Sequence, residues 1–137
     1  MSEPNPEKVV EKCGFVSDAD PGGHYLLLVE QVGINQVSLS DNECTPLLPG
    51  VATENATFAH DGRSLFYAVA SRGAVTIYRQ PWRNGKTIGA PQVAWKIPFA
   101  FPLTHRGEPA YDFSRDLSFL VYSRPGGHAD LYLLSQK

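Results

Sequence analysis

Residues 58–67 read FAHDGRSLFY, and this stretch decides how the rest of the chain is interpreted. An Asp-Gly pair stands between an aromatic residue and a short apolar run. The pattern is typical of a tight hairpin turn, because Gly adopts positive φ at little cost and Asp tolerates it. The stretch therefore predicts a two-residue hairpin at Asp61-Gly62 between two short antiparallel strands.

The same pattern occurs twice more. Residues 113–122 read FSRDLSFLVY and match residues 58–67 at a fixed offset of 55, while GHYLLL at residues 23–28 precedes GRSLFY by 39. Leu117 replaces the turn Gly, which predicts a longer or altered turn in the last copy. PGG at residues 21–23 suggests one extra residue in the first copy.

Each copy reads as a short strand, a turn, an apolar strand, a Gly turn and an amphipathic strand. Residues 45–48 and 92–97 add a further strand to the first two copies. The apolar runs at 25–29, 64–69 and 118–122 do not alternate, which favours strands buried on both faces. Four antiparallel strands in about 40–50 residues is the plan of a propeller blade.

The predicted fold class is therefore all-β, with about three four-stranded antiparallel propeller-type blades forming a partial β-propeller. The expected divisions are an N-terminal segment (1–14), repeat 1 (15–50), repeat 2 with a long connection (51–107) and an incomplete repeat 3 (108–137). Residues 7–13 are a candidate for the outer strand that repeat 3 lacks.

Residues 58–67 resemble the F-S-P-D-G-K/R-x-I/L-x-Y signature of TolB-like, WD-like propeller repeats. Residues 77–82 and 111–116 are also similar to the C-terminal blades of bacterial propellers appended to serine/threonine kinases or transcriptional regulators. The resemblance covers roughly residues 15–135 and implies the fold. It implies little about function, because such folds host many functions.

Charge and hydropathy argue against two classes of partner. The net charge is −2, so no broad electrostatic footprint for nucleic acid is present, and Arg79, Arg83 and Lys86 are interpreted as a solvated edge. The longest aliphatic run, at residues 26–29, is far too short to cross a bilayer. The first residues lack the pattern of a signal peptide, so the chain as given is expected to be cytoplasmic, or periplasmic if it is a fragment of a longer protein.

The two cysteines, Cys13 and Cys44, lie 31 residues apart and match no zinc or disulfide framework. Free buried thiols are the favoured interpretation. A single disulfide is the alternative, and it would require an oxidising compartment.

Motifs for catalysis are missing from the sequence. There is no nucleophile elbow or acylation motif, and the four histidines (His24, His60, His105 and His128) are scattered, three of them at or beside turns. No spacing of histidines or cysteines offers a metal site. We therefore expect no enzyme activity, no cofactor and no metal.

One stretch is unusual for the repeat. Residues 95–107, WKIPFAFPLTHRG, join the second and third copies and are interpreted as the cause of the longer period. Phe99 and Phe101 either plug a gap between blades or belong to a loop that docks a partner, since exposed aromatic patches mark interaction sites. The candidate partner-binding residues are Phe99, Phe101, His105 and Arg106.

The expected function is a non-catalytic recognition or scaffolding module that binds a protein or ligand. A sensory domain of a bacterial kinase or transcriptional regulator and an accessory propeller of a peptidase-type hydrolase are the alternatives. Because propellers close with about four to eight blades, we also expect the chain to self-associate, with two copies completing a ring, or to belong to a longer propeller.

Overall fold

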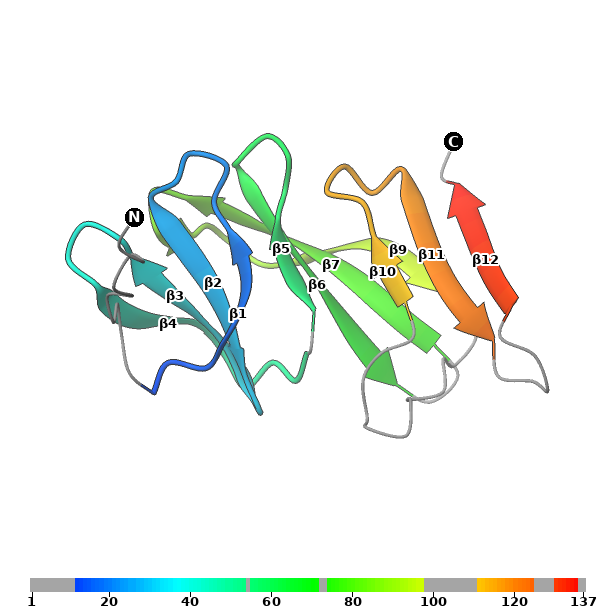
Figure 1. Ribbon diagram of the computed structural model, residues 1–137, viewed down its shortest axis with the longest axis horizontal. Coiled ribbons are helices and arrows are strands. Elements are labelled where there is room, and N and C mark those ends of the chain that lie inside the picture. The colour runs from blue at the N-terminus through cyan, green and yellow to red at the C-terminus, as the bar shows by residue number, and fades with distance from the viewer. Residues whose placement is uncertain (1–11, 54, 72–73, 98–110, 125–129, 136–137) are drawn as a thin grey trace, which may run out of the picture.

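The computed structural model describes residues 12–53, 55–71, 74–97, 111–124 and 130–135. These residues form twelve strands and no helix (Figure 1). The strands are β1 (Phe15–Ala19), β2 (Tyr25–Glu30), β3 (Gly33–Ser38), β4 (Glu43–Pro49), β5 (Ala56–Phe58), β6 (Ser64–Ser71), β7 (Ala74–Arg83), β8 (Lys86–Thr87), β9 (Gln92–Ile97), β10 (Tyr111–Phe113), β11 (Phe119–Arg124) and β12 (Asp130–Ser135).

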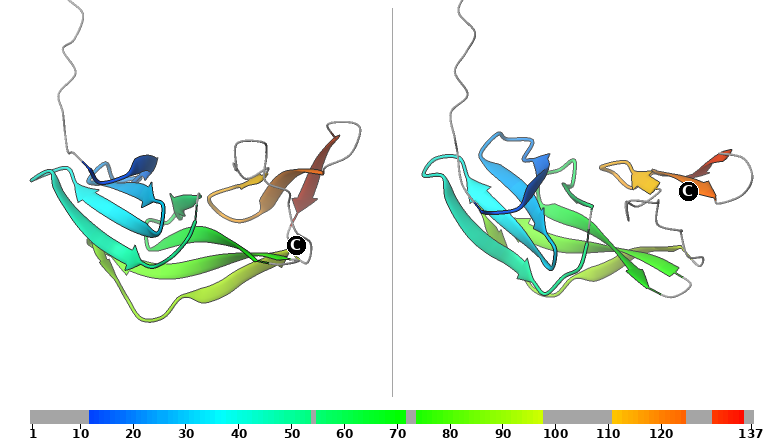
Figure 2. Two further views of the ribbon diagram at one scale, coloured as in Figure 1. Left: turned by 90° about the horizontal axis from the view of Figure 1, so that it is seen from below. Right: turned by 60° about the horizontal axis from the view of Figure 1, so that its bottom comes forward.

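The strands form three antiparallel sheets, which we call blades. Blade 1 has the order β1-β2-β3-β4, blade 2 the order β5-β6-β7 with β8 and β9 both paired to β7, and blade 3 the order β10-β11-β12. The blades follow one another in chain order in all three views (Figures 1 and 2). The all-β prediction and the partial-propeller architecture are confirmed, and blade 3 has three strands in the described residues.

Blade 2 is buried on both faces, as the unalternating apolar runs predicted. One face packs on blade 1 through a cluster that contains Leu65 and Tyr67 together with Leu27 and Ile34 of blade 1. The other face packs on blade 3 through a cluster of Ala59, Phe66, Ala68, Val75, Ile77, Phe113 and Leu117. Successive residues of β6 thus alternate between two apolar interfaces, which explains why the sequence shows no polar alternation.

The turn of residues 58–67 is longer than the predicted two-residue hairpin. Ala59 N–H donates to Ser64 O at 2.8 Å and Gly62 N–H donates to Ala59 O at 3.0 Å, so a β-turn lies inside a four-residue loop. Gly62 has φ 69°, in the left-handed region. The carboxylate of Asp61 accepts from Arg63 N–H at 2.9 Å, which fixes the loop from within.

Blade 3 repeats this turn with Leu117 in place of Gly62. Ser114 N–H donates to Phe119 O at 3.0 Å and Leu117 N–H donates to Ser114 O at 2.9 Å, while Leu117 itself has φ 58°. The prediction of an altered turn is therefore wrong. A non-Gly residue in this region costs about 1–2 kcal/mol, and Leu117 offsets that cost because its side chain is 4% exposed and packs between blades 2 and 3.

Blade 1 carries the same loop without an insertion. Asp20 N–H donates to Tyr25 O at 2.9 Å and Gly23 N–H donates to Asp20 O at 2.8 Å, with the same spacing as in the other two blades. The expected extra residue in PGG is therefore wrong.

The long second period has two sources rather than one. Leu27 pairs with Gln36 and Gln36 with Thr45, whereas the equivalent chain of pairs in blade 2 runs from Phe66 to Gln92 through Arg79. The first path covers 18 residues and the second 26. Longer hairpins within blade 2 thus supply 8 of the 16 extra residues, and the connection after residue 97 supplies only the remainder.

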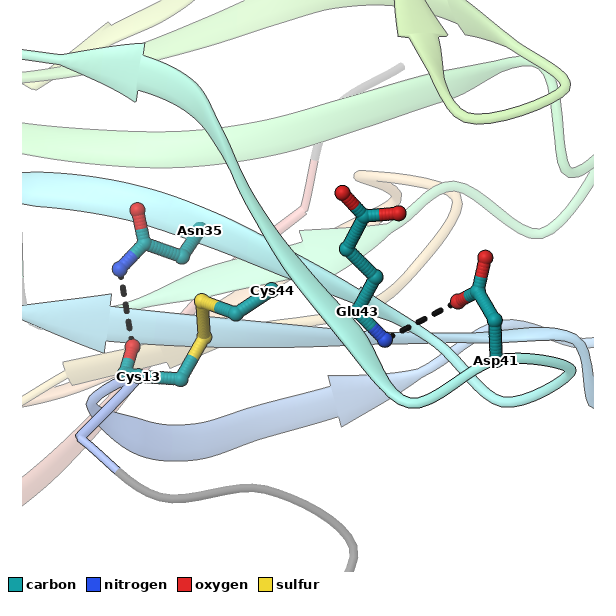
Figure 3. The surroundings of a disulfide bond; sticks show 5 residues. All are labelled: Cys13, Asn35, Asp41, Glu43 and Cys44. Atoms are coloured by element: carbon teal, nitrogen blue, oxygen red, sulfur yellow. Dashed lines mark hydrogen bonds between the residues drawn. A yellow bond between two sulfur atoms is a disulfide. The ribbon is translucent and has the colours of Figure 1, made fainter.

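The cysteines form a disulfide between Cys13 and Cys44, so the interpretation as free thiols is wrong (Figure 3). Cys13 is 2% exposed and packs with Leu28 and Val37 on the face of blade 1 that is turned away from blade 2. Asn35 Nδ2 donates to Cys13 O at 2.9 Å. The bond and this hydrogen bond hold the chain entering β1 against blade 1. Cys13 therefore does not belong to an outer strand of blade 3, and residues 7–11 lie outside the described residues.

Side chains of β1 join blade 1 to the other two blades. Asp18 of β1, whose side chain is 8% exposed, accepts from Phe58 N–H at 2.8 Å and from the Arg115 guanidinium of blade 3 at 2.5 Å. The Ser17 hydroxyl donates to Ala56 O at 2.5 Å. A carboxylate this buried needs such partners. The contact between Asp18 and Arg115, which lie 97 positions apart, therefore connects blade 1 to blade 3.

Candidate functional site

A cavity with a volume of about 670 Å³ lies between blades 1 and 2. Its walls come from three connections, β1–β2, β3–β4 and β5–β6, and from the end of β7. We call it the interblade cleft. It is lined by Asp20, Gly23, His24, Tyr25, Ser38, Leu39, Ser40, Gly62, Arg63, Trp82, Arg83 and Asn84.

The floor of the interblade cleft is aromatic. Trp82 is 4% exposed and packs edge-on against Tyr25, with ring centroids 5.3 Å apart, and against Phe58 at 5.1 Å. Its indole N–H donates to Gln36 Oε1 at 2.9 Å, and Gln36 Nε2 donates to Gly85 O at 2.9 Å. Both ends of the buried Gln36 amide are therefore satisfied, and this network fixes the floor because a half-satisfied one would cost free energy.

A tight hairpin extends blade 2 beside this floor. Arg83 pairs with Lys86 across Asn84-Gly85, whose φ values are 50° and 81°, as a two-residue type I′ turn requires. A Cβ on Gly85 would lie 3.1 Å from the hydroxyl of Tyr25, so the hairpin also needs Gly for its close approach to blade 1. This hairpin places Arg83 at the mouth of the interblade cleft.

The rim of the interblade cleft carries charged side chains. Arg63 and Arg83 are exposed, and neither has an ion pair or hydrogen bond through its guanidinium in the part of the chain that the structure describes. The His24 side chain is 77% exposed and its Nδ1 lies 3.9 Å from the carboxylate of Asp20, whose side chain is 11% exposed. The Asp20 carboxylate also accepts from His24 N–H at 3.3 Å.

A smaller cavity of about 290 Å³ lies between blades 2 and 3, lined by Arg79, Gln92, Val93, Ala94, Asp116 and Leu117. Arg79 stacks over Phe66 at 5.1 Å from the ring centroid. Hydrogen bonds from the Ser118 hydroxyl, then from Ser118 N–H and the Ser114 hydroxyl, lower the pKa of Asp116 to about 2. These groups are engaged within the turn, so this cavity is weaker as a binding site than the interblade cleft.

The residues singled out in the sequence have different outcomes. Phe99, Phe101, His105 and Arg106 lie outside the described residues, so their role stays a prediction. The group interpreted as a solvated edge is divided: Arg79 stacks over Phe66, while Arg83 lines the interblade cleft.

Sequence reasoning missed the interblade cleft, although the Trp-Arg-Asn-Gly stretch at residues 82–85 marks the hairpin that builds one of its walls. In the described residues, no three His, Cys, Asp or Glu side chains gather as metal ligands. No helix there has the length and hydropathy to cross a membrane.

No family model and no curated protein matches the chain. Among solved structures, the fold is similar to that in the crystal structure of TolB from Acinetobacter baumannii, with a TM-score of 0.54 and 16% sequence identity. The match covers 94% of this chain and 43% of that TolB chain, so this chain spans less than half of its length. The likeness supports a TolB-like β-propeller fold and carries no information about ligands.

Proposed function

We propose that this chain is a non-catalytic recognition module of the β-propeller type, and that it binds a protein partner in the interblade cleft. The observation that carries the proposal is the cleft itself. Its floor is fixed by the Trp82–Gln36 hydrogen bond of 2.9 Å, and its rim presents polar groups to solvent. A preformed concave site with an apolar floor and a few converging polar groups is typical of binding sites.

The geometry of the rim supports binding rather than catalysis. The two serine hydroxyls that line the cleft, Ser38 and Ser40, lie 2.9 Å from one another. A catalytic serine would instead be hydrogen-bonded to a base. Within the described residues, neither serine has such a bond to His24.

Peptide display against the purified chain tests the proposal. Random peptides are selected on the wild type and measured on two variants by fluorescence anisotropy. Ser40→Trp fills the cleft from its exposed rim. The control, Gln31→Trp, introduces the same side chain at the exposed β2–β3 turn, at the other end of blade 1. Loss of binding in Ser40→Trp alone supports the cleft as the site. Equal binding to both variants, or substrate turnover by the chain that His24→Ala abolishes, contradicts the proposal.

We also propose that copies of the chain associate. Three blades do not form a ring, and β1 presents Phe15 and Val16 to solvent at 82% and 66% exposed. Light scattering at micromolar concentration is expected to show a species larger than one chain, weakened by the double change Phe99→Ala, Phe101→Ala at unchanged melting temperature. A monodisperse monomer, or a melting temperature that collapses while association persists in the folded fraction, contradicts this proposal.

A further inference from the structure

We infer that the interblade cleft is selective for carboxylate groups, and that its partner is a short acidic segment of a protein. This inference rests on the proposed recognition function and specifies the chemistry of its ligand. It follows from the partners of the arginines, from the state of the neighbouring carboxylates and from the distribution of charge around the cleft.

The arginines whose side chains the structure describes fall into two pairs. Arg115 is bonded to the carboxylate of Asp18 at 2.5 Å, and Arg79 stacks over Phe66. Arg63 and Arg83 have no partner for their guanidinium groups in the described residues, and both line the interblade cleft. Of the four arginines described, the two with unpartnered guanidinium groups therefore line the same cleft.

Two carboxylates of the turns that line the interblade cleft accept hydrogen bonds from backbone N–H groups rather than from these guanidinium groups. Asp61, two residues before Arg63, directs Oδ1 to the backbone N–H of Arg63 at 2.9 Å. Asp20 directs Oδ2 to the backbone N–H of His24 at 3.3 Å. Both carboxylates thus accept hydrogen bonds within the repeated turn, and neither forms an ion pair with Arg63 or Arg83 in the described residues.

The positions of the two arginines are fixed by backbone contacts. Trp82 N–H donates to Arg63 O at 3.0 Å, which places the β5–β6 turn directly beside the end of β7 that carries Arg83. A guanidinium group presents a planar fork that matches the two oxygens of a carboxylate. Two such groups held on neighbouring backbone segments favour a ligand with two or more carboxylates.

The charge around the cleft favours a short acidic segment over a polyanion. Asp20 lines the cleft itself, Asp41 follows the lining residue Ser40, and the whole chain has a net charge of −2. A nucleic-acid backbone that extended past the arginines would meet the carboxylates of Asp20 and Asp41, which repel its phosphates. A peptide can place its carboxylates on the arginines and its apolar side chains toward Trp82 and Tyr25.

The test uses a fluorescein-labelled oligoglutamate peptide, with oligoglutamine of the same length as the neutral control. Binding is measured by anisotropy, and its place by the NMR resonance of the Trp82 indole N–H, with Trp95 as the internal reference because it packs toward blade 3. The variants are Arg63→Gln and Arg83→Gln. Lys86→Gln is the matched control, because it removes the same charge from the same hairpin outside the cleft.

We expect oligoglutamate to bind more tightly than oligoglutamine and to shift the Trp82 resonance. Each arginine change should weaken binding about tenfold, which is about 1.4 kcal/mol, and Lys86→Gln less than about twofold, as is typical of a screened surface charge. Equal binding of the two peptides, or equal losses in all three variants, overturns the inference. So does equal competition by inorganic phosphate, which would mean that the cleft takes any anion.

The two proposals fail in different ways. If oligoglutamate does not bind but display yields peptides without acidic residues that Ser40→Trp excludes, the carboxylate inference is wrong and the recognition function stands. If neither oligoglutamate nor any selected peptide depends on the cleft, both are wrong.

Discussion

The disulfide between Cys13 and Cys44 is the feature whose removal has the most direct consequence for stability. It closes a loop across 31 positions of sequence. The chain-entropy model gives about 3.7 kcal/mol of stabilisation for a loop of this length at 25 °C, because the cross-link restricts the unfolded chain. A native domain has only about 5–15 kcal/mol in total, so reduction should remove a large part of the free energy of unfolding.

The perturbation is the double change Cys13→Ala, Cys44→Ala, compared with the wild type in the presence and absence of dithiothreitol. We expect urea unfolding to show a loss of about 3–4 kcal/mol for the double variant, and the same loss for the reduced wild type. The double variant serves as its own control, because dithiothreitol should leave its midpoint unchanged.

Two results would refute this reasoning. One is a thiol-specific reagent that finds two free thiols in the non-reduced, denatured wild type. The other is a change of less than about 1 kcal/mol on reduction, far below the range typical of a native disulfide. If the loss is as expected, the folded chain should be stable chiefly in an oxidising compartment, because the reducing systems of the cytosol would break the disulfide. Expression in a reducing and an oxidising compartment, with the yield of folded chain as the readout, measures this consequence.

Three further predictions concern single positions. In a denaturant titration, Leu117→Gly should lower the free energy of unfolding by about 2 kcal/mol, because the lost packing of a buried Leu exceeds the relief of its positive φ. The control is Asn42→Gly, at an exposed position with φ 58°, which should stay within about 0.5 kcal/mol of the wild type in the same titration. Trp82→Phe should cost about 1–3 kcal/mol in chemical denaturation, because the buried carbonyl of Gln36 loses its donor. Asp116 has a pKa lowered from 3.8 to about 2, so the folded state binds fewer protons than the unfolded state between these pH values. Its contribution to the free energy of unfolding is therefore present above pH about 4 and falls as the pH drops toward about 2. This pH-dependent contribution should be missing in Asp116→Asn.

The outcomes that contradict these predictions are equally specific. A stabilising Leu117→Gly would mean that backbone strain outweighs packing at the blade 2–3 interface. A neutral Trp82→Phe would mean that water replaces the indole as the donor to Gln36. Carboxyl NMR that finds Asp116 titrating near 3.8 would mean that its hydrogen bonds to Ser118 and Ser114 do not persist in solution.

The strands and their order could be predicted from the sequence, because both depend on local signals. Residues 64–69 are apolar without alternation, and blade 2 is buried on both faces as a result. Asn84-Gly85 is a hairpin signal in the sequence, and it forms a type I′ turn because its two residues tolerate positive φ. The offset of 55 between residues 58–67 and 113–122 correctly placed a turn in blade 3, but the geometry of that turn was predicted wrongly, since Leu117 keeps the turn that Gly62 forms in blade 2.

The interblade cleft was decided by the stacking of blade 1 on blade 2, which no local pattern encodes. His24, Arg63 and Arg83 are far apart along the chain and line one cavity because three hairpins end at the same side of two packed sheets. The partners of Cys13 and Asp18 could not be predicted from the sequence either. A spacing of 31 residues does not say whether two Cα atoms come within 6.1 Å, and Asp18 meets Arg115 only after blade 3 has docked.

Leu117 is a position where the local sequence and the tertiary structure lead to opposite conclusions. Taken alone, a Leu at a turn position that favours Gly indicates a different turn, because a side chain there is strained. The tertiary structure reverses that conclusion, since the same side chain is buried in the cluster that contains Phe66 and Phe113 at the interface of blades 2 and 3. The sequence by itself determined which segments become strands and turns, through backbone preferences that act over a few residues. The packing of blades decided which residues meet, because contacts between distant segments exist only once the sheets are assembled.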